Sequence, residues 1–470
     1  MLASVEFRFV TSVQGVEIVK MNGRSIPPDS LEQSFAYQVL AAHFGPEAIK
    51  NIISSRRQFP DYLQLDLQRA ILEFMAPFNS VLHGLHQRHR ALPLILSGLL
   101  IQSPHEAILV APLQYQAVDV GEETAVHCLR SALWLANAGG CPVVVLMSRH
   151  SEDPRRPVVE VEIGYLPNAD MTKFVAEFLN SIEMAIQSSR YYRGKAISLE
   201  STAELWGTPS NVTVHRLAHV DRAEVILDDK TMTLIDRNVF EFNNHRAALR
   251  ALGLSTRKGV LFYGAPGNGK THIIRYISSN LPDHTKILIT AGEVGALSRY
   301  MALARMLQPS IVVIEDVDLI GRSRERMDDS KTEVLLNQLL NEMDGLREDA
   351  DILFILTTNR PEQIEEALAL RPGRIDQAIE IPLPDDACRA RLIRLYGERL
   401  QIDASVAAAA VERTARVSAA FMKEMVRRLA LACLSRTGGV RIGHEDVATV
   451  LDDMLAPHTL IGQRLLGVNV

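Results

Sequence analysis

Residues 264–271 have the types and the spacing that could bind phosphate groups. They read GAPGNGKT, which matches G-x-x-x-x-G-K-[ST] in full, between an apolar strand-like stretch and a helical one. Glycines there let successive backbone N–H groups turn inward as a nest for phosphate oxygens, and a helix N-terminus adds partial positive charge. Lys270 would contact the β- and γ-phosphates, and the Thr271 hydroxyl would hold Mg²⁺. We predict that ATP is bound by Gly264, Pro266, Gly267, Asn268, Gly269, Lys270, Thr271 and His272.

Two adjacent carboxylates follow a second apolar stretch, in VVIEDVD at 312–318. A buried strand that ends in acids is familiar from enzymes that hydrolyse nucleotides. The usual order there is Asp then Glu, whereas here Glu315 precedes Asp316. Strand ends are often simply solvated, so such acids carry little information alone. Beside a phosphate loop, they are predicted to lie at the carboxyl end of the same sheet, next to the bound phosphates.

The strands and helices that must position these residues indicate an α/β fold. From residue 259 onward, strand-like segments alternate with helical ones, which predicts a doubly wound parallel sheet. From about residue 385 only helical patterns remain, so a small helical subdomain is predicted at the C-terminal end. The expected strands are 259–264, 286–290, 310–316, 351–359 and 377–383.

The first 200 residues predict a separate mixed α/β domain in which no motif indicates a function. The polar stretch at 194–211 is predicted to be a linker or a short connecting hairpin. Strands are expected at 106–112, 142–148 and 157–167, and helices at 123–140, ending at Gly139 and Gly140, and at 171–186.

Composition excludes some classes of protein. The net charge of −6 disfavours a nucleic-acid binder, which usually carries a basic excess. The four cysteines lie far apart with no CxxC spacing, which fits a reducing compartment, so a cytoplasmic location is expected. The N-terminus does not read as a signal peptide. The longest apolar run, 91–101, is shorter than the about 20 residues that a membrane span needs, so a core helix or strand is expected there.

Together these motifs resemble the AAA family of ATPases over roughly residues 214–455, about half of the chain. The resemblance implies that Glu315 organises Mg²⁺ with Thr271 and that Asp316 polarises the attacking water. ILTTN at 355–359 resembles the family's sensor strand, which implies that Asn359 orients that water. The predicted domains are an N-terminal domain at 1–200, a linker at 201–213, a large α/β ATPase subdomain at 214–383, and a helical lid subdomain with a tail at 384–470.

RPGRID at 371–376 resembles the family's arginine-finger segment. The resemblance implies that Arg371 and Arg374 reach the nucleotide site of the next subunit, and therefore that the chain forms a ring, usually a hexamer. Arginine suits this role because its charge is permanent and its fork matches phosphate oxygens. The alternative is a basic turn on a solvated surface.

Three departures from the family pattern stand out. The acids are reversed, the spacing from Asn359 to Arg371 is one residue longer, and the segment 290–310 is short. That segment offers only Glu-Val-Gly at 293–295, with Tyr300 later, where threading members present an aromatic pore loop. Reversed acids and a curtailed pore segment also occur in the branch that includes the mitochondrial Rieske-protein translocase. The chain therefore resembles a relative of that branch without a membrane helix, such as a bacterial AAA chaperone.

Two function classes remain open at this point. The first is an Mg²⁺-dependent ATPase, a homohexamer that remodels or translocates protein clients recognised by residues 1–200. The second is a scaffold whose assembly is set by ATP and whose hydrolysis is slow, which the reversed acids keep open. A nucleic-acid remodeller is disfavoured by the acidic balance. The resemblance also predicts a lid helix at 415–434 that begins with Ser418, Ala419 and Ala420 and closes near the adenine.

Overall fold

The structure, a computed structural model, forms two compact units: Met1–Tyr191 with Thr202–Asn211, and Tyr192–Ser201 with Val212–Val470. Among the described residues, no helix combines the length and the apolar character that crossing a bilayer requires. The described residues are 35–87, 94–101, 108–150, 158–189, 191–199, 212–290, 293, 296–319, 341–342, 350–362 and 375–455.

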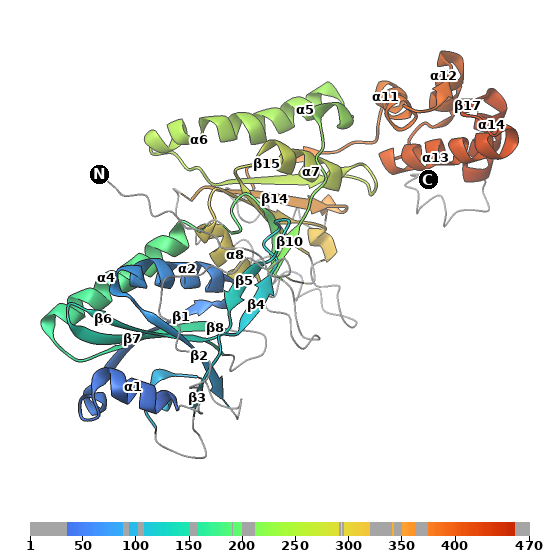
Figure 1. The fold of residues 1–470 in the computed structure, drawn as a ribbon. Helices are drawn as coiled ribbons and strands as arrows, with labels where there is room; N and C mark the ends of the chain where they lie inside the picture. The colour runs from blue at the N-terminus through green and yellow to red at the C-terminus, as the bar shows by residue number, and fades with distance from the viewer. Residues whose placement is uncertain are drawn as a thin grey trace, which may run out of the picture. The chain divides into compact units, whose positions relative to one another are not determined.

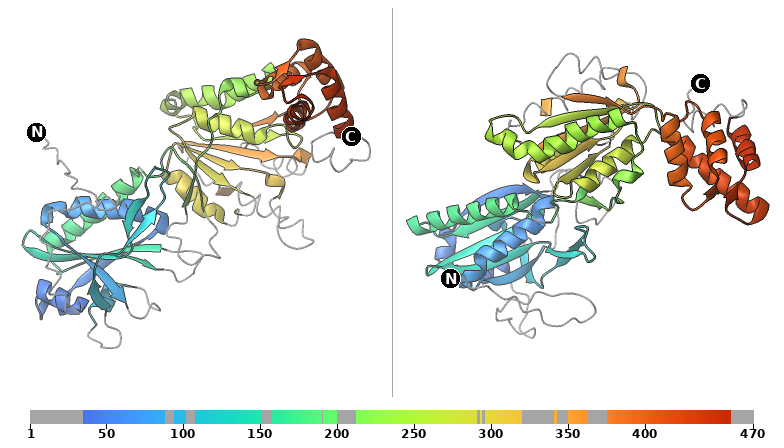
Figure 2. Two further views of the ribbon diagram at one scale, coloured as in Figure 1. Left: turned by 45° about the vertical axis from the view of Figure 1, so that its right-hand side comes forward. Right: turned by 90° about the horizontal axis from the view of Figure 1, so that it is seen from above.

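The first unit is built on an antiparallel sheet with the order β1-β8-β7-β6-β2-β3 (Figure 1). Helices α2 and α4 lie side by side on one face, joined by edge-to-face contacts between Phe74, Phe174 and Phe178, and α1 covers the other face (Figure 2). The strands are β1 (Ile53–Pro60), β2 (Val81–Gln87), β3 (Ile108–Ala111), β6 (Ala132–Ala138), β7 (Cys141–His150) and β8 (Val158–Tyr165), and the helices are α1 (Ala36–Phe44), α2 (Gln64–Met75), α3 (Leu96–Leu99) and α4 (Ala169–Gln187). A separate hairpin joins β4 (Tyr115–Val118) to β5 (Val126–Leu129).

The predicted helix at 123–140 is wrong, because this segment forms β5 and the central strand β6. An apolar run of this length fits a buried strand as well as a helix, and pairing on both sides decides between them. β6 pairs with β2 and β7, and Trp134 on it is fully buried. Gly139 and Gly140 have φ of 58° and 83°, which is the two-residue hairpin geometry rather than a helix end. The strands predicted at 106–112, 142–148 and 157–167 and the helix at 171–186 are confirmed.

The second unit contains the predicted parallel sheet, with the order β10-β9-β12-β13-β14-β11-β15. All pairs from β9 to β15 are parallel, and only β10 runs antiparallel to its neighbour. The strands are β9 (Ala196–Leu199), β10 (Val212–His215), β11 (Lys258–Tyr263), β12 (Thr285–Ile289), β13 (Ser310–Ile314), β14 (Ile352–Thr358) and β15 (Gln377–Glu380). For the segment 194–211, a linker or a short connecting hairpin is predicted. β9 near its start pairs antiparallel with β10 just after its end, as in a hairpin, and residues 200–211 lie outside the described part.

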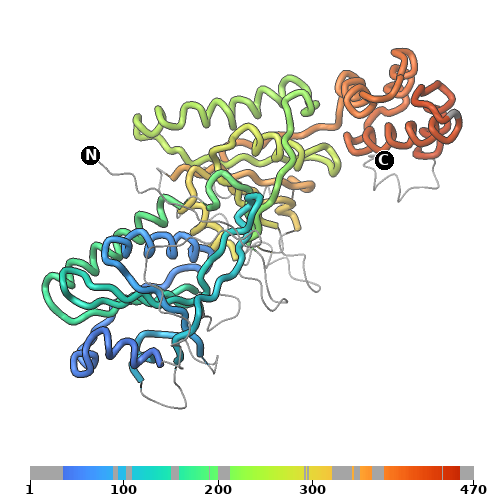
Figure 3. Tube along the Cα trace, viewed as in Figure 1, coloured from blue at the N-terminus to red at the C-terminus, as the bar shows by residue number. Residues whose placement is uncertain are grey.

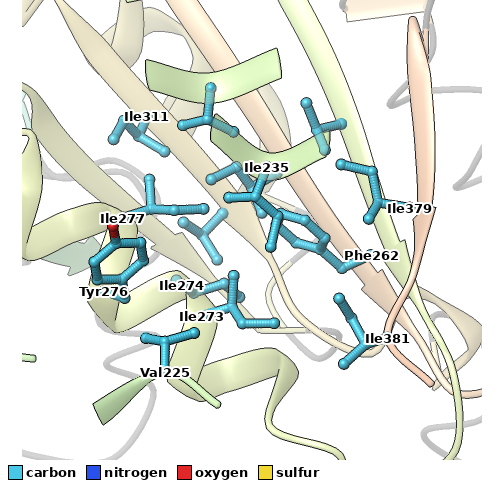
Figure 4. Close-up of a cluster of buried hydrophobic side chains, with 14 of the residues drawn as sticks. Val225, Ile235, Phe262, Ile273, Ile274, Tyr276, Ile277, Ile311, Ile379 and Ile381 are labelled. Carbon is cyan, nitrogen blue, oxygen red and sulfur yellow. The ribbon is translucent and has the colours of Figure 1, made fainter. Parts of the chain in front are cut away.

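Helices on the two faces bury this sheet. On one face, α5 (Asp229–Ile235), a π-helical turn (Asp236–Glu241) and α6 (Phe242–Ala251) form one continuous rod (Figure 3). Next to it lies α7 (Lys270–Asn280), and α8 (Leu297–Met306) packs on β12 and β13. The core joins Ile235, Phe262, Ile277 and Ile311, all 0% exposed (Figure 4). Strands covered on both faces are expected to be almost entirely apolar, as β13 and β14 are.

Tyr300 on α8 anchors the first strand of this unit. Its side chain is fully buried, and its hydroxyl accepts from the Leu199 N–H at 2.9 Å and donates to the Leu199 carbonyl at 3.1 Å. Tyr300 is the first aromatic residue after 293–295, where threading members of the family carry an aromatic pore loop. Because it is fixed inside the unit, it does not supply a pore aromatic.

The predicted helical lid is confirmed and has its own core around Phe421, Met422 and Met425. Two of its helices begin at side-chain caps, where Asp385 accepts from the Cys388 N–H and Ser418 accepts from the Phe421 N–H. The lid consists of α11 (Asp386–Tyr396), α12 (Ala404–Arg413), α13 (Ala419–Thr437) and α14 (His444–Leu455), with the short strands β16 (Gln401–Ile402) and β17 (Arg441–Ile442).

A buried histidine at the amino end of the sheet predicts a loss of stability in acid. His284 is 5% exposed, and its Nε2 lies 2.9 Å from Nη1 of Arg246, which can only donate, so this nitrogen is unprotonated. Burial, helped by the charges of Arg246 and Lys286, lowers the pKa of His284 from 6.5 to about 4. At pH values between these two, His284 is protonated in the unfolded chain and neutral in the folded chain. The free energy of unfolding is therefore expected to fall with decreasing pH, by at most about 3 kcal/mol.

The measurement is the melting temperature at pH 7 and at pH 4.5 for the wild type and for His284→Gln, which keeps an acceptor for Arg246. The variant is expected to lose less stability between the two pH values. An equal loss in both proteins would contradict the assignment.

Candidate active site

The phosphate loop connects β11 to α7, and its three glycines, Gly264, Gly267 and Gly269, all have positive φ. A Cβ on Gly264, whose φ is 143°, would lie 2.3 Å from the Ile381 carbonyl oxygen. Gly267, with φ of 80°, faces the start of the lid helix α13, and a Cβ there would lie 3.0 Å from Cβ of Ala420. The Ala420 N–H also donates to the Gly267 carbonyl at 3.0 Å. The first turn of α13 therefore meets the loop directly, at the residues that the sequence singled out.

Lys270 points back across this loop. Its Nζ donates to the carbonyls of Gly264 at 2.8 Å and Ala265 at 3.1 Å, and to Oδ1 of Asn359 at 2.7 Å. Burial lowers the pKa of Lys270, and the negative charges of Asp316 and Asp318 act against that shift. The ammonium group thus lies at the centre of the loop, where it can compensate phosphate charge.

Thr271 and Glu315 form the pair that fits a magnesium ion. The Thr271 hydroxyl at the start of α7 donates to Oε2 of Glu315, just beyond the end of β13, at 3.0 Å. Mg²⁺ is usually held by one or two protein oxygens together with water and substrate phosphates. A hydroxyl and a carboxylate in contact beside the phosphate loop supply such a donor set. These two residues would hold the ion.

Asp316, Asn359 and Lys270 form a continuous chain of hydrogen bonds. Lys270 can only donate, so the amide oxygen of Asn359 faces it and the amide NH₂ donates to Oδ1 of Asp316 at 3.0 Å. Asp316 itself has φ of 50°, and its N–H donates to the Thr357 hydroxyl at 3.0 Å. Sequence reasoning missed Thr357. The signal available for it was a polar residue at the end of an otherwise apolar strand.

The remaining predicted ligands lie at the edge of this group. Asn268 is 5% exposed, and its amide donates to the Ile381 carbonyl at 3.0 Å, so it ties the loop to the chain that leaves β15. Nε2 of His272 lies 3.1 Å from the Glu224 carbonyl, to which it donates. Pro266 is exposed in the loop. Direct contact of these three residues with a nucleotide stays a prediction.

The predicted arginine fingers, Arg371 and Arg374, lie outside the described residues. Described residues resume at Ile375, and Asp376 exchanges hydrogen bonds with Gly259: its Oδ2 accepts from the Gly259 N–H at 2.8 Å, and its own N–H donates to the Gly259 carbonyl at 2.9 Å. Asp376, the last residue of RPGRID, therefore lies at the amino end of β11.

Comparisons with known proteins match the part of the chain that carries this site. Residues 260–383 match the model of the ATPase family associated with various cellular activities (AAA). The chain is 32% identical over 258 residues to ATP-dependent zinc metalloprotease FtsH 2 of Thermoanaerobacter sp. (strain X514), which covers 53% of this chain and 48% of that protein. It is 38% identical over 160 residues to 26S proteasome regulatory subunit 10B of Dictyostelium discoideum, covering 32% of this chain and 40% of that protein. The chain thus spans about half, or less, of the length of these relatives.

Proposed function

We propose that this chain, whose residues 260–383 match the model of the AAA family of ATPases, hydrolyses ATP with Mg²⁺ to remodel or translocate protein clients. The observation that carries the proposal is the hydrogen-bonded chain from Lys270 through Asn359 to Asp316, beside the Thr271–Glu315 pair. Together these contacts join a phosphate-binding cation, a carboxylate that can act as a base and a pair of magnesium ligands.

Each residue has a defined task in this proposal. The phosphate loop and Lys270 bind the phosphates and compensate their charge, and bound Mg²⁺ would neutralise further phosphate charge. Asp316 accepts the proton of the attacking water, and Asn359 holds that water between Asp316 and the terminal phosphate. Asp is one methylene shorter than the Glu usual in this role. Because proton-transfer geometry is sensitive at about 1 Å, we expect slower turnover than with Glu.

The names of the relatives support protein clients, since one is a zinc metalloprotease and the other a proteasome regulatory subunit. The first unit would recognise the client. Threading through an aromatic pore loop has little support, because 290–299 contains no aromatic residue and Tyr300 is buried. The kinship with the branch that has reversed acids, and a cytoplasmic location, stay predictions.

The second candidate is a scaffold that ATP assembles and that hydrolyses slowly. It is favoured by the reversed order of Glu315 and Asp316. The two candidates separate in one assay, in which ATP turnover per chain is measured against protein concentration. A motor turns over steadily, and its rate rises as the ring assembles. ATP binding with assembly but without turnover would leave only the scaffold.

Arg374→Ala is expected to abolish ATP turnover if the finger acts between subunits of a homohexamer. Stabilisation of the transferring phosphate by such an arginine contributes about 10³–10⁵ in rate. Turnover and oligomer size should be measured together, so that a lost finger is distinguished from a lost ring. Arg394→Ala, at an exposed position of α11, is the matched control and should keep its activity. Wild-type turnover in Arg374→Ala would rule out this residue as the finger.

A further inference from the structure

Asp318 is a buried carboxylate beside the site that the proposed mechanism does not use. It lies in a short 3₁₀ turn, Val317–Leu319, directly after the two adjacent acids, and is 5% exposed. Its Oδ1 accepts two hydrogen bonds, from the Thr358 hydroxyl at 2.9 Å and from the Asn359 backbone N–H at 3.1 Å. A single oxygen of Asp318 thus binds both residues at the end of β14.

These two contacts lie where the hydrogen bonding of the sheet ends. The pairing of β14 with β13 ends at Ile314 and Leu356 and that with β11 at Tyr263 and Thr358, and the N–H of Asn359, beyond both, donates to Asp318. An unpaired backbone N–H beside a buried site is costly, and Asp318 satisfies it. The Thr358 hydroxyl in turn accepts from the Arg360 N–H at 2.9 Å, which fixes the next peptide as well.

Asn359 needs this support because its amide has two partners, a donor at its oxygen and an acceptor at its NH₂. Its oxygen accepts from Lys270 at 2.7 Å, and its NH₂ donates to Asp316 at 3.0 Å. A shift of the Asn359 backbone or a rotation of its side chain would break one contact or both. Catalytic geometry of this kind loses about 10²-fold in rate for a displacement of about 1 Å.

We propose that Asp318 is the positioning residue of the hydrolytic site: its carboxylate holds the backbone of Thr358 and Asn359, so that the Asn359 amide bridges Lys270 and Asp316. This inference rests on the proposed hydrolysis of ATP. It differs from a metal-ligand role, because Oδ1 of Asp318 already accepts two protein donors while Thr271 and Glu315 contact each other. It also differs from plain capping of a strand, which would stabilise the fold without changing turnover.

Two substitutions at one position, made in the full chain, test the proposal. Asp318→Ala removes the acceptor, and Asp318→Asn keeps an oxygen for both donors but removes the charge. We expect kcat of Asp318→Ala to fall about 10²-fold while KM for ATP changes less than about threefold, because the phosphate loop is untouched. Asp318→Asn is expected to recover kcat to within about fivefold of the wild type, with an unchanged Mg²⁺ requirement. Melting temperature and equilibrium binding of ATP check that each variant is folded.

Wild-type kcat in Asp318→Ala would overturn the positioning role, and so would an Asp318→Asn variant as inactive as the alanine variant. If Asp318→Ala does not fold, Thr358→Val gives the answer, because it removes one of the two donors and leaves the carboxylate. Its kcat should fall about threefold to tenfold at unchanged KM, and an unchanged kcat would contradict the proposal. A wild-type chain that binds ATP without hydrolysing it would instead contradict the proposed function itself.

Discussion

Replacing Asp316 by Asn is expected to stop ATP turnover while leaving ATP binding intact. In the wild type, Nδ2 of Asn359 donates to Oδ1 of Asp316 at 3.0 Å. The substitution keeps the size of the side chain and an oxygen that can accept this hydrogen bond. It removes the only property that a base needs, which is the ability to take a proton from water. General base catalysis contributes about 10²–10⁴ in rate, so kcat should fall by that factor. Single-turnover measurements with radiolabelled ATP and equilibrium binding in parallel would show both effects.

A matched control for this experiment is Asp453→Asn, which removes a carboxylate from the exposed side of the lid helix α14. It should hydrolyse ATP as the wild type does. If Asp316→Asn kept its turnover, Glu315 would have to supply the base, and the reversed pair would then have its two roles exchanged. If the proposed ring forms, the same variant, by retaining ATP, should stabilise it and allow a proposed protein client to be captured with it.

The parallel sheet of the second unit could be predicted because its strands carry two independent signals. The segments at 310–316 and 351–359 are continuous apolar runs that end in polar residues, as buried parallel strands do. Helical spacing between the strands then leaves parallel pairing as the simple solution. The phosphate loop predicts a nucleotide site at the carboxyl ends of the strands, and β13 and β14 bring Asp316 and Asn359 within hydrogen-bonding distance there.

The segment 123–140 could not be assigned from its own residues. Its apolar positions satisfy helical spacing, and only the pairing of β6 with β2 and β7, which come from elsewhere in the chain, makes it a strand. Gly139 and Gly140 were the one local signal. A Gly-Gly pair between apolar runs indicates a tight hairpin as readily as it ends a helix.

In the site, sequence reasoning named residues that would act on the nucleotide, but it gave no role to Thr357 and Asp318, which hold them. Like Asp316 and Asn359, these two residues lie in VVIEDVD or ILTTN, but they act only through contacts across adjacent strands. Such contacts depend on the register of β13 against β14, in which Ile314 is opposite Leu356. A shift of one residue would turn these side chains to the other face of the sheet, and the spacing of motifs does not specify that register.

Replacing Lys270 by Met is expected to remove both ATP binding and ATP turnover without unfolding the chain. Met keeps the aliphatic stem of the side chain and removes the ammonium, which lies 2.8 Å and 3.1 Å from two loop carbonyls and 2.7 Å from the Asn359 amide oxygen. Truncating one partner of a buried charge pair costs 2–5 kcal/mol or more in binding, so affinity for ATP should fall about 30-fold or more. Burial lowers the pKa of Lys270, which means that burial disfavours its charged form.

Removing this buried charge offsets part of the loss of three hydrogen bonds, so Lys270→Met should stay folded without nucleotide, and added ATP should no longer raise its melting temperature. ATP stabilises the wild type because it binds the folded chain only, and the rise grows with the ratio of ATP concentration to Kd. Lys173→Met, at an exposed position on α4, is the control and should keep the full rise. If Lys270→Met were stabilised by ATP like the wild type, the nucleotide would bind elsewhere, and the assignment of 264–271 as the phosphate site would fail. Because the variant is expected to stay folded, loss of the ATP effect would report on the phosphate contact alone.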